Sequence, residues 1–278
     1  MSIFYVDGQY VPAEKAVIPV DDLSILRGVG VFDFMRTFNG KPHHLKEHVA
    51  RLENSARKIG LELPWSHEEL IAIVNTTLEK NQVPEANIRI VITGGSSPDF
   101  ITPQNTPRLL VMVTPIIQPP SEWYTNGIKI ITVHTRRNLP EAKSIDYIRA
   151  TIALREAKKA GAKEAVYLDR EHYVLEGTTS NIFAIINGVL ITPGHSILPG
   201  ITRKIVLEIS RSLMDHRVEK LSLSALYSAE EVFITGSGKG LVPVVQVDDH
   251  MIGDGRPGPK TKLLLEALAL QKSNQDIP

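Results

Sequence analysis

Three residue patterns in the middle third of the chain could carry out chemistry together. Lys143 follows a predicted strand in Ala-Lys-Ser, and a partly desolvated lysine amine is a group that attacks carbonyl carbons. Glu176 precedes a run of small polar residues, and its carboxylate could keep a ring nitrogen protonated. Gly200-Ile201-Thr202 opens a predicted helix, where free N–H groups bind anions. An amine, a carboxylate and an anion site are together what pyridoxal phosphate requires.

Each pattern alone also has an ordinary structural explanation. A lone lysine is most often a solvated surface residue, a glutamate before glycine is common in turns, and many helices begin with Gly-x-Thr without binding a ligand. The glycine-rich run 235–240 superficially suggests a nucleotide-binding loop. It lacks the G-x-x-x-x-G-K-[ST] spacing, so we reject that function. The interpretation therefore depends on the order and spacing of the three patterns together.

Ala-Lys-Ser, Leu-Glu-Gly-Thr-Thr-Ser-Asn-Ile-Phe and Leu-Pro-Gly-Ile-Thr-Arg, in this order, resemble the motifs of the class IV (fold type IV) aminotransferases. The resemblance runs from about Phe4 to Leu268. The family includes branched-chain aminotransferases, D-amino-acid aminotransferases and aminodeoxychorismate lyase. The resemblance implies an α+β fold of two domains, pyridoxal 5'-phosphate as cofactor, and a homodimer in which the neighbouring chain lends the Arg27 region to each active site.

The resemblance also implies roles for individual residues. Lys143 would bind the cofactor covalently and act as general base and acid, and Glu176 would pair with the pyridine nitrogen. Arg51 matches the phosphate-binding arginine of a His-x-x-Arg-Leu pattern. The implied cofactor-binding residues are Lys143, Glu176, Arg51, Ile201, Thr202, Ser237, Gly238 and Tyr147.

Some of these positions depart from the family pattern. Gly238 and Lys239 differ from the usual residues of the second phosphate loop. Tyr147 lies four residues past Lys143, whereas branched-chain members carry a cofactor-binding tyrosine five residues past the lysine, so core packing is an equal alternative. Residues 178–181 are expected to shape the turn and to bond backbone groups.

Phe32, Arg27 and Arg89 are the expected substrate-binding residues. Phe32 stands where bacillus-type D-amino-acid enzymes carry Tyr, and Asp99 replaces the arginine of their carboxylate clamp. A substrate carboxylate still needs a cation, and Arg27 and Arg89 are the candidates. Arg89 lies among apolar strand residues, where burying an unpaired guanidinium is costly, so we expect it to bind a carboxylate. A structural ion pair is the alternative.

We therefore expect an aminotransferase that moves the α-amino group of an amino acid to a 2-oxo acid such as 2-oxoglutarate. The short segment 28–33 resembles D-amino-acid enzymes, so D-alanine or D-glutamate is the expected donor. Phe32, Arg89 and the Leu-Pro-Gly-Ile-Thr-Arg run favour an L-branched-chain aminotransferase, the first alternative. Aminodeoxychorismate lyase is the second. A non-enzymatic binding module would leave Lys143 and Glu176 unexplained.

The composition excludes several other functions. The 278 residues carry 31 basic and 31 acidic side chains, so no basic field attracts nucleic acid. There is no cysteine, which excludes disulfides, thiolate zinc and a cysteine nucleophile, and no metal site is expected. No apolar run reaches the ~18 residues of a membrane span, and the N-terminus does not resemble a signal peptide. We expect a soluble, cytoplasmic enzyme.

Periodicity and turn signals predict the elements that position these residues. Three prolines in 115–120 predict a linker at 116–122, between a small domain, 1–115, and a large domain, 123–278, that carries Lys143, with the cofactor in the cleft between them. A capping box at Ser66 begins one helix, and 24–30 is expected to be a loop. Strands are predicted at 3–6, 10–11, 31–38, 87–93, 109–113, 128–133, 165–169, 174–175, 181–186 and 231–235. Helices are predicted at 44–60, from 66, and at 145–160, 201–213 and 261–270, the last with Leu263, Leu264, Ala267 and Leu268 inward.

Overall fold

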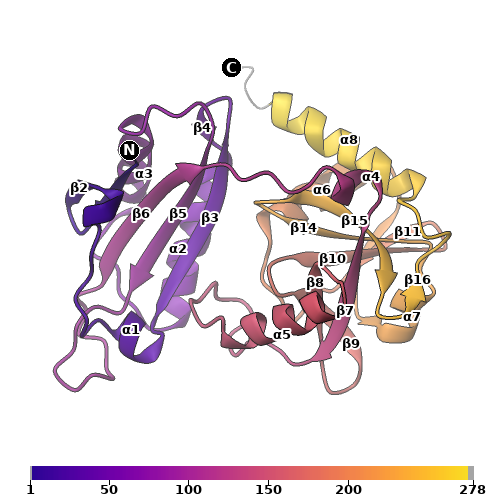
Figure 1. Ribbon diagram of the computed structural model, residues 1–278, viewed down its shortest axis with the longest axis horizontal. Coiled ribbons are helices and arrows are strands. Elements are labelled where there is room, and N and C mark those ends of the chain that lie inside the picture. Colours follow the sequence, from indigo (N-terminus) through magenta and orange to yellow (C-terminus); the bar gives the residue numbers. More distant parts are fainter. Residues whose placement is uncertain (1, 275–278) are drawn as a thin grey trace. The chain divides into compact units, whose positions relative to one another are not determined.

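The computed structural model describes residues 2–274, and the chain divides into two compact units (Figure 1). The N-terminal unit comprises Met1–Ile117 with Glu141–Tyr147, and the C-terminal unit comprises Gln118–Pro140 with Ile148–Pro278. The first change of unit, after residue 117, falls within the stretch predicted as a linker. The segment around Lys143 groups with the N-terminal unit, although the sequence assigned it to the large domain. Residues 1 and 275–278 of the predicted domains lie outside the described residues.

An antiparallel sheet of six strands forms the N-terminal unit, in the order β2-β1-β6-β5-β3-β4. The strands are β1 (Ile3–Val6), β2 (Gln9–Pro12), β3 (Gly30–Phe38), β4 (Lys41–Pro42), β5 (Ala86–Thr93) and β6 (Arg108–Pro115). Asp7 and Gly8 join β1 to β2 with φ of 48° and 93°, as a two-residue hairpin turn of the primed type requires. Because side chains alternate along a strand, β3 directs Val31 and Met35 to one face and Phe32 to the other.

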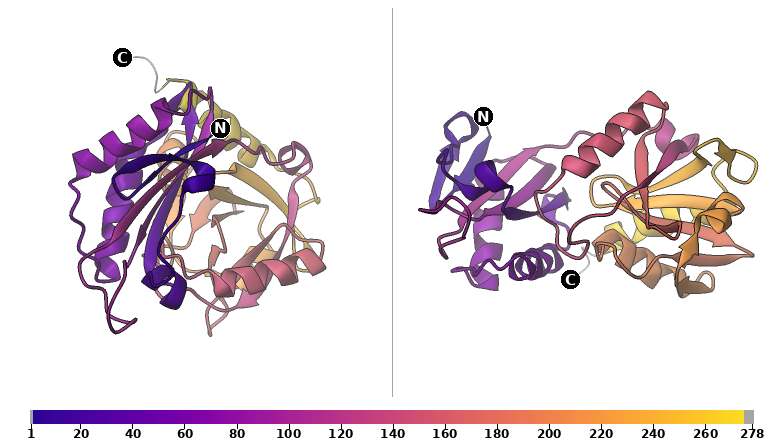
Figure 2. Two further views of the ribbon diagram at one scale, coloured as in Figure 1. Left: turned by 60° about the vertical axis from the view of Figure 1, so that its left-hand side comes forward. Right: turned by 90° about the horizontal axis from the view of Figure 1, so that it is seen from below.

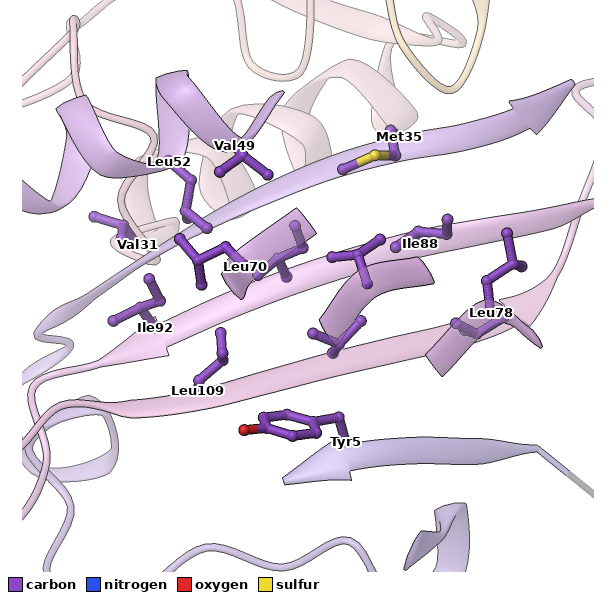
Figure 3. Packing of buried hydrophobic residues seen from close by; sticks show 14 of the residues in the cluster. Tyr5, Val31, Met35, Val49, Leu52, Leu70, Leu78, Ile88, Ile92 and Leu109 are labelled. Atoms are coloured by element: carbon purple, nitrogen blue, oxygen red, sulfur yellow. The ribbon is translucent and has the colours of Figure 1, made fainter. Parts of the chain in front are cut away.

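Two helices, α2 (Leu45–Lys58) and α3 (His67–Glu79), cover the Val31 face of this sheet (Figure 2). Val49 and Leu52 of α2 are fully buried against the strands, and Figure 3 shows them in one apolar layer with strand residues such as Ile92. Burying a side chain such as Leu52 contributes roughly 1.5–3 kcal/mol. This layer holds α2, which carries Arg51, against β3.

The C-terminal unit contains a mixed sheet of ten strands in the order β12-β11-β10-β14-β15-β7-β8-β9-β13, with β16 paired to β15. Its strands are β7 (Ile128–His134), β8 (Glu164–Leu168), β9 (Tyr173–Gly177), β10 (Asn181–Ile186), β11 (Val189–Thr192), β12 (His216–Val218), β13 (Leu221–Ser222), β14 (Glu231–Gly236), β15 (Gly240–Val247) and β16 (His250–Met251). Its helices are α4 (Glu122–Thr125), α5 (Ile148–Lys159), α6 (Ile201–Ser210), α7 (Leu223–Tyr227) and α8 (Pro259–Asn274). The parallel strands β7 and β8 are joined through α5, the usual crossover for such a pair.

Apolar contacts fix α6 and α5 to the C-terminal sheet. α6 packs through Ile205 and Val206 around the stacked rings of Phe183 and Phe233, whose centroids are 4.8 Å apart. α5 buries only alanines, which permit a close approach of the helix to β8. The start of α6, which carries Thr202, is therefore set by a packed core.

Most predicted elements are confirmed to within a few residues at their ends. The loop predicted at 24–30 is wrong: α1 (Leu23–Arg27) forms there. Asp22 caps it by accepting from Ser24 N at 2.8 Å, and Gly28 ends it with φ of 68°. The helix predicted from 145 begins at Ile148. Leu263 is exposed, so its predicted inward position is also wrong.

Over residues 2–274, no helix has the length and apolarity to cross a bilayer, and no group of three or more potential metal ligands gathers.

Candidate active site

Lys143 is held by its backbone against the first residues of β3. Its carbonyl accepts from Phe32 N at 2.9 Å, and its N–H donates to Oγ of Ser55 at 3.0 Å. The next residue, Ser144, forms an antiparallel bridge with Val31. These contacts fix the position of the lysine Cα.

The ring of Phe32 is where three other predicted site residues meet. Nζ of Lys143 lies 4.7 Å from the ring centroid, and the ring of Tyr147 packs edge-on with centroids 5.5 Å apart. Cζ of Arg89 lies 5.4 Å from the same centroid and 5.6 Å from that of Phe34. Cation–π contacts at exposed sites contribute only about 0.5–1 kcal/mol, so they orient these cations without immobilising them. Phe32 therefore places a lysine amine and a guanidinium beside one aromatic ring.

The two arginines predicted to bind substrate have different surroundings. Arg89 is exposed on the sheet face opposite α2 and α3, and no carboxylate in the described part of the chain lies within ion-pair distance of it. The alternative of a structural ion pair therefore finds no support. Arg27 is exposed at the end of α1, where its Nη1 donates to the carbonyl of Leu26 at 2.8 Å.

Arg51 belongs to a buried network with Asp33 and His48. Its Nε and Nη2 donate to the two carboxylate oxygens of Asp33 at 2.9 and 2.8 Å, and Nδ1 of His48 lies 2.6 Å from Oδ1 of Asp33. Burial alone would raise the pKa of Asp33, but the charge of Arg51 and the contact with His48 outweigh it and hold this pKa well below its usual value. Burial also lowers the pKa of His48 despite Asp33. The network fixes the guanidinium, and Nη1 is the nitrogen outside this carboxylate fork.

Sequence reasoning identified Arg51 but missed the residues around it. His48, Arg51 and Ser55 follow at i, i+3 and i+7, so they share one face of α2. Oγ of Ser55 donates to the carbonyl of Arg51 at 2.7 Å and accepts from Lys143 N, which links α2 to the lysine. This spacing was the available signal. Nothing local to Asp33 indicated its pairing.

Glu176 is a buried carboxylate on β9 and is 3% exposed. Its Oε2 accepts from Leu198 N at 2.9 Å, and Nη1 of Arg137 lies 3.6 Å from its Oε1. Both neighbours present donor atoms, which suits an ionised side chain. The residue offers a rigid negative charge, and Arg137 is a neighbour that sequence reasoning missed.

The start of α6 presents backbone N–H groups that no side chain caps. Gly200 is the N-cap residue, and no side chain caps the N–H groups of the first turn, which begins Ile201-Thr202. Asn181 holds this start: its Nδ2 donates to the carbonyl of Leu198 at 2.9 Å. A Cβ on Gly200 would lie only 1.9 Å from Oδ1 of Asn181, so the close approach requires glycine. Open N–H groups and the positive end of the helix dipole favour a bound anion.

The second predicted phosphate segment is the tight turn between β14 and β15, with Ser237 and Gly238 at its tip. Thr235, just before the turn, pairs with Asn181 across β14 and β10. The turn and the α6 start thus both adjoin Asn181. Oγ1 of Thr235 is buried without a hydrogen-bond partner among the described residues.

The hydroxyls of Thr178, Thr179 and Ser180 all donate to the carboxylate of Glu164. The prediction that they bond backbone groups was wrong, because the buried carboxylate of Glu164 on β8 accepts their hydrogen bonds. Asn181 does bond a backbone carbonyl, as predicted. Glu164 was missed by sequence reasoning.

Each of these groups suits one part of pyridoxal phosphate. Lys143 offers an amine on a fixed backbone, Glu176 a buried carboxylate for a protonated ring nitrogen, and the start of α6 an uncapped anion site. The partnerless hydroxyl of Thr235 beside that anion site is a donor that a bound group can satisfy.

Known proteins are similar in sequence to this chain along almost its whole length. Residues 30–247 match the family described as amino-transferase class IV. A protein of Methanocaldococcus jannaschii, provisionally named a branched-chain-amino-acid aminotransferase, is 37% identical over 270 residues, which cover 94% of this chain and 93% of that protein. The D-alanine aminotransferase of Staphylococcus epidermidis strain RP62A is 32% identical over 271 residues, 95% of each chain.

Solved structures share the fold. A branched-chain amino acid aminotransferase from T.th., complexed with N-(5'-phosphopyridoxyl)-L-glutamate, superposes with a TM-score of 0.92 at 30% identity, covering 99% of this chain and 95% of that chain. The Escherichia coli branched-chain enzyme gives 0.89 at 28% identity, covering 95% and 92%. The predicted fold type and cofactor are thereby confirmed. The chain belongs to the class IV aminotransferases and is a pyridoxal-phosphate-dependent transaminase.

Proposed function

We propose that this transaminase acts on D-amino acids, with D-alanine or D-glutamate as donor and 2-oxoglutarate as acceptor. The observation that carries the proposal is the exposed Arg89 guanidinium beside the Phe32 ring that also carries the Lys143 amine. An amino acid presents its carboxylate one carbon from its amine, so a guanidinium near the reacting lysine suits it. The short segment 28–33 and the similarity to a D-alanine aminotransferase support the D hand.

The loop that would hold a bacillus-type clamp is acidic in this chain. Oδ1 of Asp99 accepts from Ser97 Oγ at 2.7 Å, Ile101 N at 2.9 Å and Thr102 N at 2.8 Å. These hydrogen bonds hold the pKa of Asp99 well below its usual value, and the one from Thr102 N has the largest effect. A fixed negative charge here would repel a substrate carboxylate. We therefore assign the clamp to Arg89, with Arg27.

The residues of the cofactor site act in distinct ways. Bound pyridoxal phosphate supplies an electron sink for the charge that forms at the substrate Cα when its proton leaves. Nζ of Lys143 takes this proton and later returns it. As the family resemblance implies, Glu176 would keep the pyridine nitrogen protonated, and Tyr147 would donate to the phenolic oxygen. The residues that would hold the phosphate are Arg51, Ile201, Thr202, Ser237 and Gly238.

An L-branched-chain aminotransferase is the second candidate. The rings of Phe32 and Phe34, both beside Arg89, form an apolar surface that an aliphatic side chain could contact. Similarity to branched-chain aminotransferases, 37% identity for the archaeal protein, points the same way.

Half-reactions with single amino acids test whether the donor is a D- or an L-amino acid. The purified holoenzyme is mixed separately with D-alanine, D-glutamate, L-leucine and L-valine, and the loss of the visible absorbance of the bound cofactor is followed. We expect fast loss with the D-acids. Fast loss with L-leucine and none with either D-acid would overturn the proposal in favour of the second candidate.

Arginine variants test the clamp. Loss of one arm of a charged clamp costs roughly 2–5 kcal/mol, so Arg89→Ala or Arg27→Ala should lower kcat/KM at least tens-fold and leave the cofactor spectrum intact. Arg57→Ala is a matched control, because Arg57 is exposed and contacts only Asn54 on its own helix in the described structure. If both variants match the control, neither arginine is the clamp.

We further propose a homodimer. Large apolar side chains are exposed at the N-terminal end of the chain and on a neighbouring loop; they are Val17, Val20, Ile25, Leu26, Phe100 and Ile101. The two segments adjoin through Leu23 N, which donates to Gly95 O at 2.9 Å. Such a patch suits a second copy of the chain. Sedimentation should give a dimer, and a stable, fully active monomer would contradict the proposal.

A further inference from the structure

Glu164 is a buried carboxylate that none of the roles above uses. It begins β8 and is 1% exposed. Its Oε1 accepts from Oγ1 of Thr178, and its Oε2 accepts from Oγ1 of Thr179 at 2.8 Å and from Oγ of Ser180 at 3.0 Å. Three consecutive hydroxyls that follow Glu176-Gly177 therefore end on one carboxylate.

Lys239 completes this cluster from the turn between β14 and β15. Its Nζ lies 3.0 Å from Oε2 of Glu164 and 2.8 Å from Oγ1 of Thr179, and its side chain is 17% exposed. Burial alone would raise the pKa of Glu164, but the charge of Lys239 and the hydroxyls of Thr178 and Thr179 outweigh it and lower this pKa. A buried carboxylate is costly without such a cation.

The ion pair joins two segments that lie close together. A Cβ on Gly236, at the end of β14, would lie 3.2 Å from the carbonyl of Thr179. The carbonyl of Lys239 also accepts from the hydroxyl of Tyr124 at 2.9 Å, which fixes the turn from its other side. Packing of this kind transmits a small displacement of the turn to its neighbours.

We propose that Glu164 and Lys239 are positioning residues that hold the Ser237-Gly238 turn at a fixed distance from Glu176. Pyridoxal phosphate carries its ring nitrogen and its phosphate on one small molecule, so the two segments that would bind them must stay within the reach of a single cofactor. The proposal rests on the proposed roles of Glu176 and Ser237. It assigns to Lys239, which departs from the family pattern, a role in cofactor affinity and none in the proton transfer.

The test is the preference of the full-length apoenzyme for pyridoxal phosphate over pyridoxal, which lacks the phosphate. Dissociation constants for both are measured by titration of the visible absorbance. Lys239→Met should weaken pyridoxal phosphate roughly 10- to 100-fold, the range found when outer-shell partners of bound metal ions are removed, and should change pyridoxal much less. Glu164→Gln should act in the same direction. The double variant should be less impaired than the two single effects combined, because both changes break one pair.

Two further variants separate positioning from a general loss of structure. Lys239→Arg keeps the charge and should retain most of the preference. Lys204→Met removes an exposed lysine on α6, paired only with Glu208 at 3.8 Å in the described structure, and should change nothing. Equal weakening of both ligands by Lys239→Met, an unchanged preference, or a loss in Lys239→Arg as large as in Lys239→Met would overturn the proposal. A wild-type protein that binds neither ligand would instead refute the cofactor site itself.

Discussion

Replacing Asp33 by Asn should destabilise the N-terminal unit by about 3–5 kcal/mol, the usual cost of removing one partner from a buried ion pair. Asp33 is fully buried, and Arg51 is 9% exposed. Both oxygens of Asp33 accept from the guanidinium, at 2.9 and 2.8 Å. An amide of the same shape can accept only one of these hydrogen bonds and carries no charge. The substitution leaves Arg51 as a buried cation whose carboxylate is gone.

The two tryptophans of the chain allow each unit to be followed separately. Trp65 packs against the core of the N-terminal unit and Trp123 against the core of the C-terminal unit. In a Trp123→Phe background, urea unfolding followed by fluorescence reports on Trp65 alone. With a urea dependence of about 2 kcal/mol per M, the midpoint should fall by roughly 1.5–2.5 M.

Glu141→Gln is the control for this prediction, because it lies in the same unit as Trp65. Its side chain is 61% exposed and pairs with Lys58, and exposed pairs contribute little. A midpoint shift for Asp33→Asn no larger than that for Glu141→Gln would refute the argument, because Arg51 would then be satisfied without Asp33.

Three further changes have definite expected outcomes. Gly95→Ala should cost at least about 1–3 kcal/mol, because φ is +70° and the new Cβ would lie 2.0 Å from Thr106 O; an unchanged melting temperature would contradict this. Ser66→Ala should cost about 1 kcal/mol in urea unfolding by breaking the capping box, and no loss would mean the box is inert. The native pKa of Glu164 is lowered, so its ionisation stabilises the fold above its ordinary pKa of 4.5 and less as pH falls. The stability difference between wild type and Glu164→Gln should therefore shrink from pH 7 to pH 4. A constant difference would refute the inference that the pKa of Glu164 is lowered in the folded protein.

The sequence predicted the elements whose signals are local. The hairpin at Asp7-Gly8 and the box at Ser66 are confirmed because their turn and cap chemistry is written in adjacent residues. α1 was missed because five residues are too few for a periodic pattern. Its available signals were the cap residue Asp22 and the terminating Gly28. β15 was missed because it contains Pro243, and proline normally argues against a central strand.

Site residues could be predicted only where they belong to a recognised sequence motif. Lys143 and Glu176 follow from recognised runs, but the pairing of Glu164 with Lys239 joins residues far apart in the chain, which no local pattern shows. The exposure of Arg89 could have been foreseen. Ile88 and Ile90 are buried on one face of β5, so alternation places the residue between them on the other.

The central claim is that Lys143 carries the cofactor, and borohydride reduction of the holoenzyme tests it most directly. Reduction fixes the bound cofactor to its lysine, and mass spectrometry of the digested protein then locates the label. The account predicts a pyridoxyl-phosphate label on the peptide that contains Lys143 and loss of that label in Lys143→Ala. A label on any other lysine, such as Lys239, or a wild-type protein that takes up no label with added cofactor would contradict it.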